Sequence, residues 1–419
     1  METGEQSPRR LADSVSLGVL ARWVPRDEID TAVAVTGKKA KRRDGKLPPH
    51  VMVYFTMAMA LFADDDYEEV LARLTDALAA WPDCWDTLWE APGSGGITQA
   101  RQRLGSEPLR ELFSRVAEPV ADMLTPGAFL GTWRLVSIDG MEWDLPDSGE
   151  NAAFFGYAGS GGKRSAFPKV RVVALAECAS HAYFAAAIGG VGTGKGSGEQ
   201  SLARTLWAAL DEDMLLIADR NFYSFPDWRQ ARASGAQLLW RVKAGLRLPV
   251  LERLPDGSYL SVLVDPDIGG KRREALVEAA RAGADLDPGQ AALVRVVEYT
   301  VPDRDPGQDG ELICLITTIV DLRDGPAATL AEIYHHRWEH ETGNDQIKTH
   351  LRGPGRVLRS RKPDLVLAEL YGYLLTHYAL NALICEAATE AQIDPDRVKF
   401  TRTVRKVRSR TDDAADFPP

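Results

Sequence analysis

The sequence predicts an α/β protein in which a mixed sheet with flanking helices is interrupted by a β-rich insertion and preceded by an all-α N-terminal domain. Three observations predict this class. Apolar residues recur at helical spacing through about the first 125 residues. Short β-rich segments alternate with helical ones over residues 126–243. A stretch punctuated by Pro and Gly then separates this region from a last, mainly helical part.

The composition is that of an ordinary soluble protein. The chain has 419 residues, of which 45% are hydrophobic and 26% charged, enough for two or three domains with substantial cores. Its four cysteines form no CxxC pair, which favours a reducing compartment and provides no zinc framework. The N-terminus lacks the apolar core of a signal peptide, and the nearly apolar run 51–63 is too short to span a bilayer. We therefore expect a cytoplasmic protein with no membrane partner.

Residues 1–125 are predicted to form the helical N-terminal domain. Helices are expected at 11–24, 27–35, 50–62, 67–80, 98–104 and 107–124, with a Gly/Pro/Ser break at 91–96. Two interpretations of the last pair, which Gly105 joins, stay open. It could be a helix-turn-helix with Arg101, Arg103 and Arg110 facing DNA, or simply two packed helices.

Residues 126–243 are predicted to form the first part of a core sheet. The first strand, 133–138, stops at Asp139 and the fourth, 214–218, stops at Asp219. The remaining elements are a hairpin of 170–178 and 181–189, helices at 199–210 and 225–233, and a strand at 237–242. This order is that of the ribonuclease-H-like fold, which places acidic residues on the first strand, at the end of the fourth and on a later helix.

Three further regions complete the prediction. Residues 244–311 form a β-rich insertion subdomain, 312–390 a second part of the core with a packing helix at 363–388, and 391–419 a basic segment with a disordered tail. The net charge of −10 argues weakly against a nucleic-acid partner, although local charge decides phosphate binding. Basic clusters at 38–43 and 397–410 are either solvated charge runs or phosphate contacts.

The segment 334–348 lacks Pro and is predicted to be a helix. At about 100° per residue, Tyr334, Arg337, Glu341 and Lys348 share one narrow stripe, with Glu339 on the opposite face. Such a stripe can present a metal-binding carboxylate between groups that hold phosphate.

The spacing Tyr-x2-Arg-x3-Glu-x6-Lys in this segment resembles the catalytic-glutamate helix of DDE transposases of insertion-sequence family 4. The segment Asp219-Arg220-Asn-Phe-Tyr is also similar to a segment of that family, and the likeness covers roughly residues 130–390. The resemblance implies a DNA transposase with a ribonuclease-H-like domain. It further implies cleavage at the ends of an insertion element and transfer of the freed 3′-hydroxyl into target DNA.

The same resemblance implies a metal site. Asp139, Asp219 and Glu341 are the expected catalytic residues and metal ligands, because hard Mg²⁺ or Mn²⁺ prefers carboxylate oxygens. Two such ions about 3.5–4 Å apart can serve both the attacking and the leaving oxygen of an in-line displacement.

Four further side chains are expected to contact DNA. Arg337 and Lys348 would hold phosphates, and Tyr334 would either stack on a base or bind phosphate through its hydroxyl. Arg220 is a phosphate contact, a partner that holds the acidic cluster, or a member of an ordinary ion pair. The expected partners are the element's terminal inverted repeats and target DNA, with a homodimer or higher multimer at work. The protein would be bacterial and associated with the nucleoid when bound to DNA.

Two features keep alternatives open. Gly343 and Asn344 depart from the family's pattern, which raises the possibility of a catalytically silent DNA-binding remnant. The residues His336, Glu339 and His340 also match the H-x-x-E-H pattern of zinc metallopeptidases, although solvated histidines that match it by coincidence are the favoured interpretation.

Overall fold

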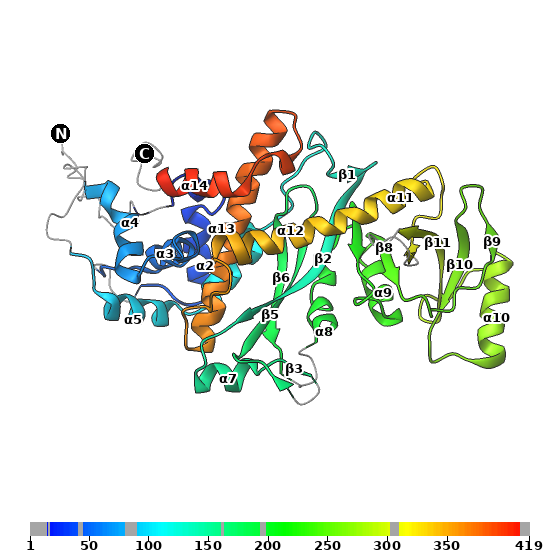
Figure 1. Ribbon diagram of the computed structural model, residues 1–419, viewed down its shortest axis with the longest axis horizontal. Coiled ribbons are helices and arrows are strands. Elements are labelled where there is room, and N and C mark those ends of the chain that lie inside the picture. The colour runs from blue at the N-terminus through cyan, green and yellow to red at the C-terminus, as the bar shows by residue number, and fades with distance from the viewer. Residues whose placement is uncertain are drawn as a thin grey trace, which may run out of the picture.

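The computed structural model describes residue 15 and residues 17–40, 45–79, 90–160, 163–192, 198–301 and 310–410. A long mixed sheet occupies the middle of the molecule, a helical layer lies at one end, and a long helical run crosses the sheet (Figure 1). Several predictions lie wholly or partly outside the described residues, among them the helices at 11–24 and 67–80, the cluster at 38–43 and the disordered tail.

The N-terminal layer is helical, as predicted. It consists of the 3₁₀ turn η1 (Gly18–Arg22) and helices α2 (Arg26–Val35), α3 (Pro49–Leu61), α4 (Tyr67–Ala79), α5 (Ser94–Leu104) and α6 (Glu107–Val116). Helix α3 is almost wholly buried and packs against α13 (Pro363–Glu390). Gly372 permits this close approach, because a Cβ there would lie 2.7 Å from the carbonyl oxygen of Thr56. The N-terminal layer therefore shares one hydrophobic core with helix α13.

One predicted boundary in this layer is wrong, and Arg101 does not fit the helix-turn-helix interpretation that the sequence left open. The helix predicted at 107–124 ends at Val116, because Pro119 restricts Glu118 and disfavours helical backbone before it. Arg101 does not face solvent. Its side chain is 3% exposed and donates hydrogen bonds to Tyr67 Oη (2.6 Å) and Ser360 Oγ (3.0 Å), so it serves packing rather than DNA contact.

The core sheet has the predicted ribonuclease-H-like order. Its strands β2 (Trp133–Asp144), β5 (Lys169–Glu177) and β6 (Tyr183–Gly190) pair antiparallel, and β2, β7 (Met214–Ala218) and β8 (Gln237–Val242) pair parallel. Short elements accompany them: β1 (Phe129–Leu130), α7 (Gly149–Phe155), β3 (Gly159–Ser160), β4 (Lys163–Arg164) and α9 (Phe225–Arg232).

Two of the predicted boundaries differ from the structure. Strand β2 continues through Asp139 to Asp144, because β5 pairs with it along this whole length. The helix predicted at 199–210 is a short α8 (Glu199–Ala203) followed by the 3₁₀ turn η2 (Trp207–Ala209).

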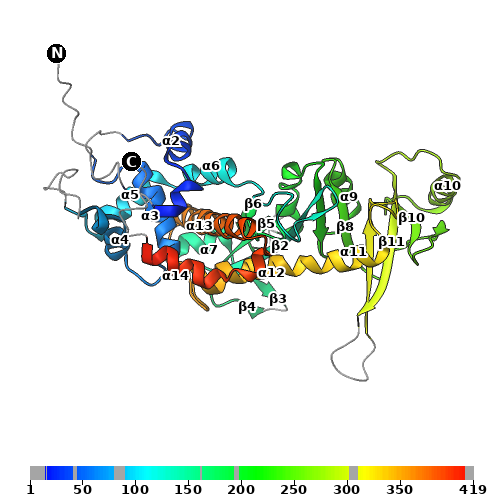
Figure 2. The ribbon, with the colours of Figure 1, turned by 90° about the horizontal axis from the view of Figure 1, so that it is seen from above.

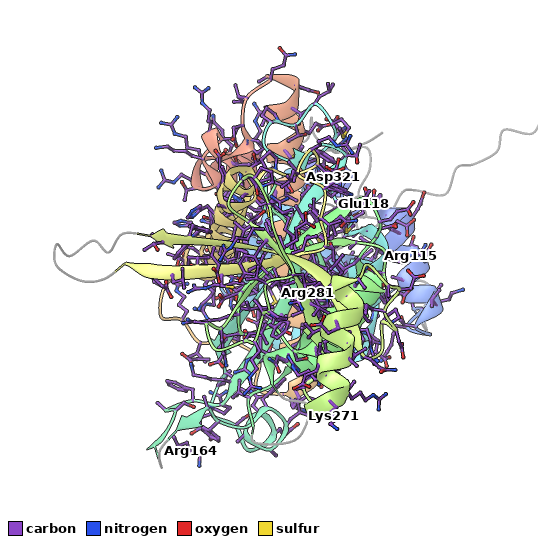
Figure 3. All side chains as sticks on the ribbon, turned by 90° about the vertical axis from the view of Figure 1, so that its right-hand side faces the viewer. Arg115, Glu118, Arg164, Lys271, Arg281 and Asp321 are labelled. Atoms are coloured by element: carbon purple, nitrogen blue, oxygen red, sulfur yellow. The ribbon has the colours of Figure 1, made fainter. Side chains whose placement is uncertain are left out.

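The region predicted as an insertion continues the same sheet. After β8 come β12 (Glu311–Thr317), β11 (Ala291–Val301), β10 (Tyr259–Val264) and β9 (Glu252–Arg253), all antiparallel, giving ten strands in total. Helix α10 (Gly270–Arg281), which was not predicted, covers this end and carries exposed Lys271 and Arg281 (Figure 3). The predicted domain boundary at 244 follows β8, whereas the one at 311 falls at the first residue of β12, so both lie within one continuous sheet. The division into domains stays a prediction.

The predicted signature helix is longer and less regular than expected. Helix α11 (Ala327–Tyr334), the 3₁₀ turn η3 (His335–Arg337), helix α12 (Trp338–Asp345) and the π-helical turn η4 (Gln346–Leu351) form one run, which Figure 2 shows nearly end to end. Because 3₁₀ and π turns change the rotation per residue, the ideal 100° stripe does not hold over its full length.

The C-terminal part follows this run. After α13 come the 3₁₀ turn η5 (Pro395–Arg397) and helix α14 (Phe400–Arg410), which holds much of the second basic cluster and was not predicted as a helix. Among the described residues, none of the helices is long and apolar enough to cross a membrane.

Candidate active site

Strand register places Asp139 beside Asp219. Strands β2 and β7 are parallel neighbours, with Ile138 opposite Ala218. Asp139 is the next residue on β2, and Asp219 is the first residue after β7. Two aspartates that are distant in sequence therefore occupy adjacent positions across a pair of hydrogen-bonded strands.

The signature helix lies over the same face of the sheet. Side chains two apart on a strand point the same way, so Leu135 and Ser137 share the face of Asp139. Leu135 packs in one hydrophobic cluster with Tyr334, and Ser137 Oγ lies 3.0 Å from His340 Nδ1. Because His340 directly precedes Glu341, this packing brings the start of α12 over the two aspartates.

The charges of the other two carboxylates act on Asp139. Burial raises the pKa of Asp139, and the negative charges of Glu341 and Asp219 raise it further. The Gly140 amide, which donates to Asp139 Oδ1 at 2.8 Å, and the guanidinium of Arg337 act in the opposite direction. A half-buried set of mutually repelling carboxylates is the donor set that a hard divalent cation requires, so the residues present fit such an ion.

Arg337 holds Glu341 in this arrangement. Its Nη1 donates to Glu341 Oε1 at 2.9 Å, and its guanidinium lies 4.8 Å from the ring centre of Trp338, which is 56% exposed. Among the described side chains, the three carboxylates do not bring one oxygen each within 4.8 Å of one another. This spacing is expected without a cation, because like charges separate and Arg337 provides a competing partner for Glu341.

Tyr334 is buried rather than presented to solvent. Its side chain is 6% exposed, and its hydroxyl has no hydrogen-bond partner among the described residues. Burial raises the pKa of this phenol, and the negative charge of Asp219 raises it further. The buried Tyr334 ring therefore cannot stack on a base in this conformation, as was predicted for it. The Tyr334 hydroxyl has no hydrogen-bond partner among the described residues, and the negative charge of Asp219 acts on it.

The two remaining basic residues differ in their surroundings. Lys348 lies half-buried in the π-helical turn, and no ion-pair partner for it occurs in the described part of the chain. Arg220 is exposed, with Nη1 3.6 Å from Glu311 Oε1 on β12. The structure thus gives Arg220 a partner outside the acidic cluster.

Two family models cover most of the chain. The model described as "Insertion element 4 transposase N-terminal" matches residues 14–114, and the one described as "Transposase DDE domain" matches residues 133–378. The chain belongs to the DDE transposases of insertion-sequence family 4. It is accordingly an enzyme that cleaves and joins DNA strands, and enzymes with this domain depend on divalent metal ions.

Two Escherichia coli proteins are similar to this chain in sequence, and one solved structure aligns with it. The transposase InsG for insertion sequence element IS4 of Escherichia coli K12 is 28% identical over 360 residues, which is 85% of this chain and 74% of the relative. The putative transposase InsZ of the same organism is 32% identical over 132 residues, 30% of this chain and 42% of the relative. A cryo-EM structure of the piggyBac transposase synaptic complex with hairpin DNA aligns with a TM-score of 0.46 at 12% identity, over 95% of this chain and 80% of that one.

A fourth carboxylate near the transposase's aspartates was missed by sequence reasoning. Glu199 begins α8, and a Cβ built on Gly140 would lie 2.0 Å from Glu199 Oε1. Burial raises the pKa of Glu199 most, and the negative charge of Asp139 raises it further. From sequence alone, Glu199 was indistinguishable from the acidic residues that the helix dipole commonly favours in a first turn.

The zinc-peptidase alternative is wrong. His340 is buried against Tyr183, with ring centres 5.2 Å apart, and one of its nitrogens contacts Ser137. The Glu339 carboxylate contacts a different histidine, with Oε2 2.9 Å from His181 Nε2. In the described part of the chain, His336, Glu339 and His340 do not converge on one point.

Proposed function

We propose that Asp139, Asp219 and Glu341 hold two Mg²⁺ or Mn²⁺ ions and form the catalytic site for cutting the ends of an insertion element and joining them to target DNA. The observation that carries the proposal is the parallel register of β2 and β7, which sets Asp139 beside Asp219 beneath the helix of Glu341. When bound, the ions supply positive charge at the attacking and leaving oxygens of an in-line displacement.

The chain's own residues position this site. The Gly140 amide fixes one oxygen of Asp139, and the sheet fixes the separation of the two aspartates. Without a cation, Arg337 Nη1 donates to Glu341 Oε1 and fixes the position of this carboxylate. Releasing Glu341 from Arg337 would free the carboxylate for a cation and the guanidinium for a phosphate, so a single exchange of partners would serve both.

Four side chains of this region are proposed to contact DNA phosphates. Lys348 offers a half-buried ammonium without an ion-pair partner among the described residues. Arg337 offers a fork that can hold a phosphate bidentately. Tyr334 can offer only its hydroxyl, and Arg220 can reach phosphate by giving up its exposed contact with Glu311, which costs little.

The larger assembly is proposed on the family's chemistry. The DNA partners would be the terminal inverted repeats of the element and a target duplex, with the helical layer before residue 125 binding the repeats. Because two element ends must be joined to one target, a homodimer or higher multimer is the working form. Bound to DNA, it would lie on the bacterial nucleoid in the cytoplasm.

The test uses duplexes that carry the ends of the element from which this chain is encoded. We expect cleavage and strand joining that require Mg²⁺ or Mn²⁺ and that disappear in Asp139→Asn, Asp219→Asn and Glu341→Gln. The matched control is Glu332→Gln, which removes an exposed carboxylate from the same helical run and should leave the reaction intact. Metal-dependent joining by any of the three site variants at the normal rate would overturn the assignment.

A further inference from the structure

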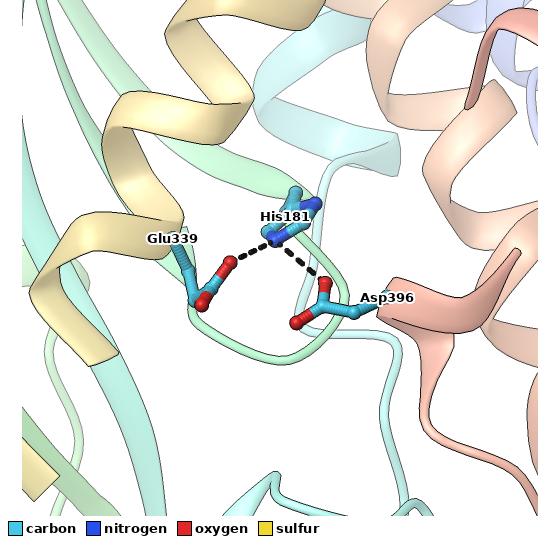
Figure 4. A group of neighbouring side chains, drawn as sticks. All are labelled: His181, Glu339 and Asp396. Atoms are coloured by element: carbon cyan, nitrogen blue, oxygen red, sulfur yellow. Dashed lines mark hydrogen bonds and ion pairs between the residues drawn. The ribbon is translucent and has the colours of Figure 1, made fainter. Parts of the chain in front are cut away.

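A second group of metal-type ligands lies outside the catalytic cluster. His181, Glu339 and Asp396 each place one ligand atom within 4.8 Å of the other two (Figure 4). His181 Nε2 lies 2.9 Å from Glu339 Oε2 and 3.2 Å from Asp396 Oδ1.

The three ligands come from separate parts of the fold. His181 lies in the turn between β5 and β6, Glu339 on α12, and Asp396 in the turn η5 before the last helix. His181 adopts φ 59°, a left-handed conformation that is uncommon outside glycine and costs of order 1–3 kcal/mol unless its surroundings fix it. The chain therefore holds this imidazole between two carboxylates at a conformational cost.

The charge of the group favours a cation. Two carboxylates approach one ring nitrogen, and a protonated imidazole supplies a single positive charge for two negative ones. A divalent ion would balance the charges of both carboxylates with the imidazole neutral. In a tetrahedral zinc site with bonds of about 2.0–2.2 Å, neighbouring ligand atoms lie about 3.4 Å apart. The observed 2.9 and 3.2 Å need to open by only a few tenths of an ångström.

The second nitrogen of His181 contacts a buried side-chain amide. Gln346 Nε2 lies 3.0 Å from His181 Nδ1, and Gln346 Oε1 contacts His377 and Asn381. Which amide atom is oxygen is an assignment that follows from the hydrogen-bond network. If Gln346 and Asn381 both turn over, the Gln346 oxygen accepts Nδ1–H and leaves Nε2 free for a metal. With the two amides as they stand or with both turned over, two of the three contacts among Gln346, His377 and Asn381 pair a donor with an acceptor.

The group is open on one side. His181 and Asp396 line a pocket of about 230 Å³, and the side chain of Asp396 is 44% exposed. Three protein ligands and one position open to water form the arrangement of zinc sites that are not closed by a fourth side chain.

From these observations we infer that His181, Glu339 and Asp396 form a binding site for a first-row transition metal ion, best suited to Zn²⁺. An imidazole with two carboxylates suits zinc better than it suits Mg²⁺, which prefers oxygen ligands alone. Such an ion would fasten the segment before α14 and the β5–β6 turn to the helix that carries Glu341, two residues beyond Glu339. The ion would stabilise the position of that helix and would take no part in the reaction on DNA.

The test is direct zinc binding by the full chain. To remove binding at the catalytic cluster, the background is Asp139→Asn with Asp219→Asn, and excess Mg²⁺ is present throughout. Titration calorimetry should show one equivalent of Zn²⁺, and Co²⁺ should give the visible absorption of a four-coordinate site. Adding Asp396→Asn or His181→Asn should weaken Zn²⁺ binding at least about tenfold, given that loss of outer-shell partners alone costs 10–100-fold. Asn at 181 tolerates the left-handed backbone.

The control is Glu390→Gln, which removes an exposed carboxylate at the end of α13 and should leave Zn²⁺ binding unchanged. Circular dichroism melts of the metal-free variants verify folding, and the Co²⁺ spectrum tests the unaltered ligands independently of any substitution. Absence of Zn²⁺ uptake, uptake that persists in either ligand variant, or an equal loss in Glu390→Gln would overturn the inference. None of these outcomes depends on strand joining, so the test of the zinc site is independent of the test of the catalytic site.

Discussion

Gly343 on α12 lies against the ring of Tyr183 on β6. A Cβ at position 343 would be 3.0 Å from Tyr183 Oη and 3.1 Å from its Cε1, closer than side chains normally approach. The same hydroxyl donates to Asn344 Oδ1 at 2.7 Å. The two residues that depart from the family's pattern thus make one compensated contact with a single buried tyrosine, which argues against a site loosened by decay.

We predict that Gly343→Ala destabilises the transposase despite the better helix propensity of Ala. The propensity gain is about 1 kcal/mol, whereas overpacking costs about 1–3 kcal/mol. Tyr183 cannot move aside easily, since it is wholly buried between His340 and His377. Thermal unfolding of Gly343→Ala, Tyr183→Phe and the double variant should show a smaller loss in the double variant than the two single losses combined.

Gly95→Ala in α5 is the matched control, because a Cβ there meets nothing within 4 Å. It should raise the melting temperature or leave it unchanged. A stabilised Gly343→Ala protein would show that Tyr183 yields and that the close contact has no energetic meaning.

The sequence predicted the order of the core strands well, because Met214–Ala218 and Gln237–Val242 are short apolar runs with clear ends. It could not predict that Arg101 is buried, since its partner Ser360 lies far along the chain. It also missed Glu199, whose position above Gly140 depends on how α8 packs on the sheet. Local periodicity predicts elements, whereas contacts between distant segments need the tertiary fold.

Asp139→Asn should stabilise the metal-free protein at neutral pH. The folded-state pKa of Asp139 is raised above its ordinary value, mainly by burial, so the ionised form destabilises the fold. This penalty is present in full above the raised folded-state pKa, shrinks as the pH falls through it and is gone below the ordinary pKa of an aspartate. In metal-free buffer, Asp139→Asn should therefore melt higher than the unaltered chain at pH 7, and the difference should shrink in acid. A lower melting temperature at pH 7 would contradict it.

Asp219→Ala should separate DNA binding from chemistry. Phosphate contacts supply most of the affinity for DNA, whereas the carboxylate is proposed to act only in the reaction. Gel-shift affinity for element ends should stay within about threefold of the normal value, a change of less than 1 kcal/mol. Cleavage and joining with Mg²⁺ should be lost. Equal cleavage by the variant would remove Asp219 from the site.

Glu199→Gln should change how strongly the transposase depends on metal concentration. The carboxylate lies over Gly140, where it adds negative charge beside Asp139 without being one of the three proposed ligands. Removing that charge should raise the Mg²⁺ concentration needed for half-maximal cleavage by several-fold while saturating Mg²⁺ restores the rate. Glu150→Gln, an exposed acid in the first turn of α7, is the control. An unchanged Mg²⁺ dependence would make Glu199 a packing residue only.

Lys348→Ala should weaken DNA binding on all sequences alike. If its ammonium holds a phosphate, binding releases counterions, and the slope of log affinity against log salt should become shallower by about 0.9 for the lost contact on duplex DNA. Lys271→Ala, at the exposed start of α10, is the control and should leave the slope unchanged.

Arg337→Lys completes this test because it keeps the charge and loses the planar fork. The guanidinium already holds Glu341, so its loss should impair strand joining more than DNA affinity. A solvated helix face predicts neither effect, with changes within about 0.5 kcal/mol. An unchanged salt slope in Lys348→Ala, together with normal joining in Arg337→Lys, would leave both residues as ordinary surface cations. In that case the four-residue spacing of the helix would be a family marker without a role in phosphate binding.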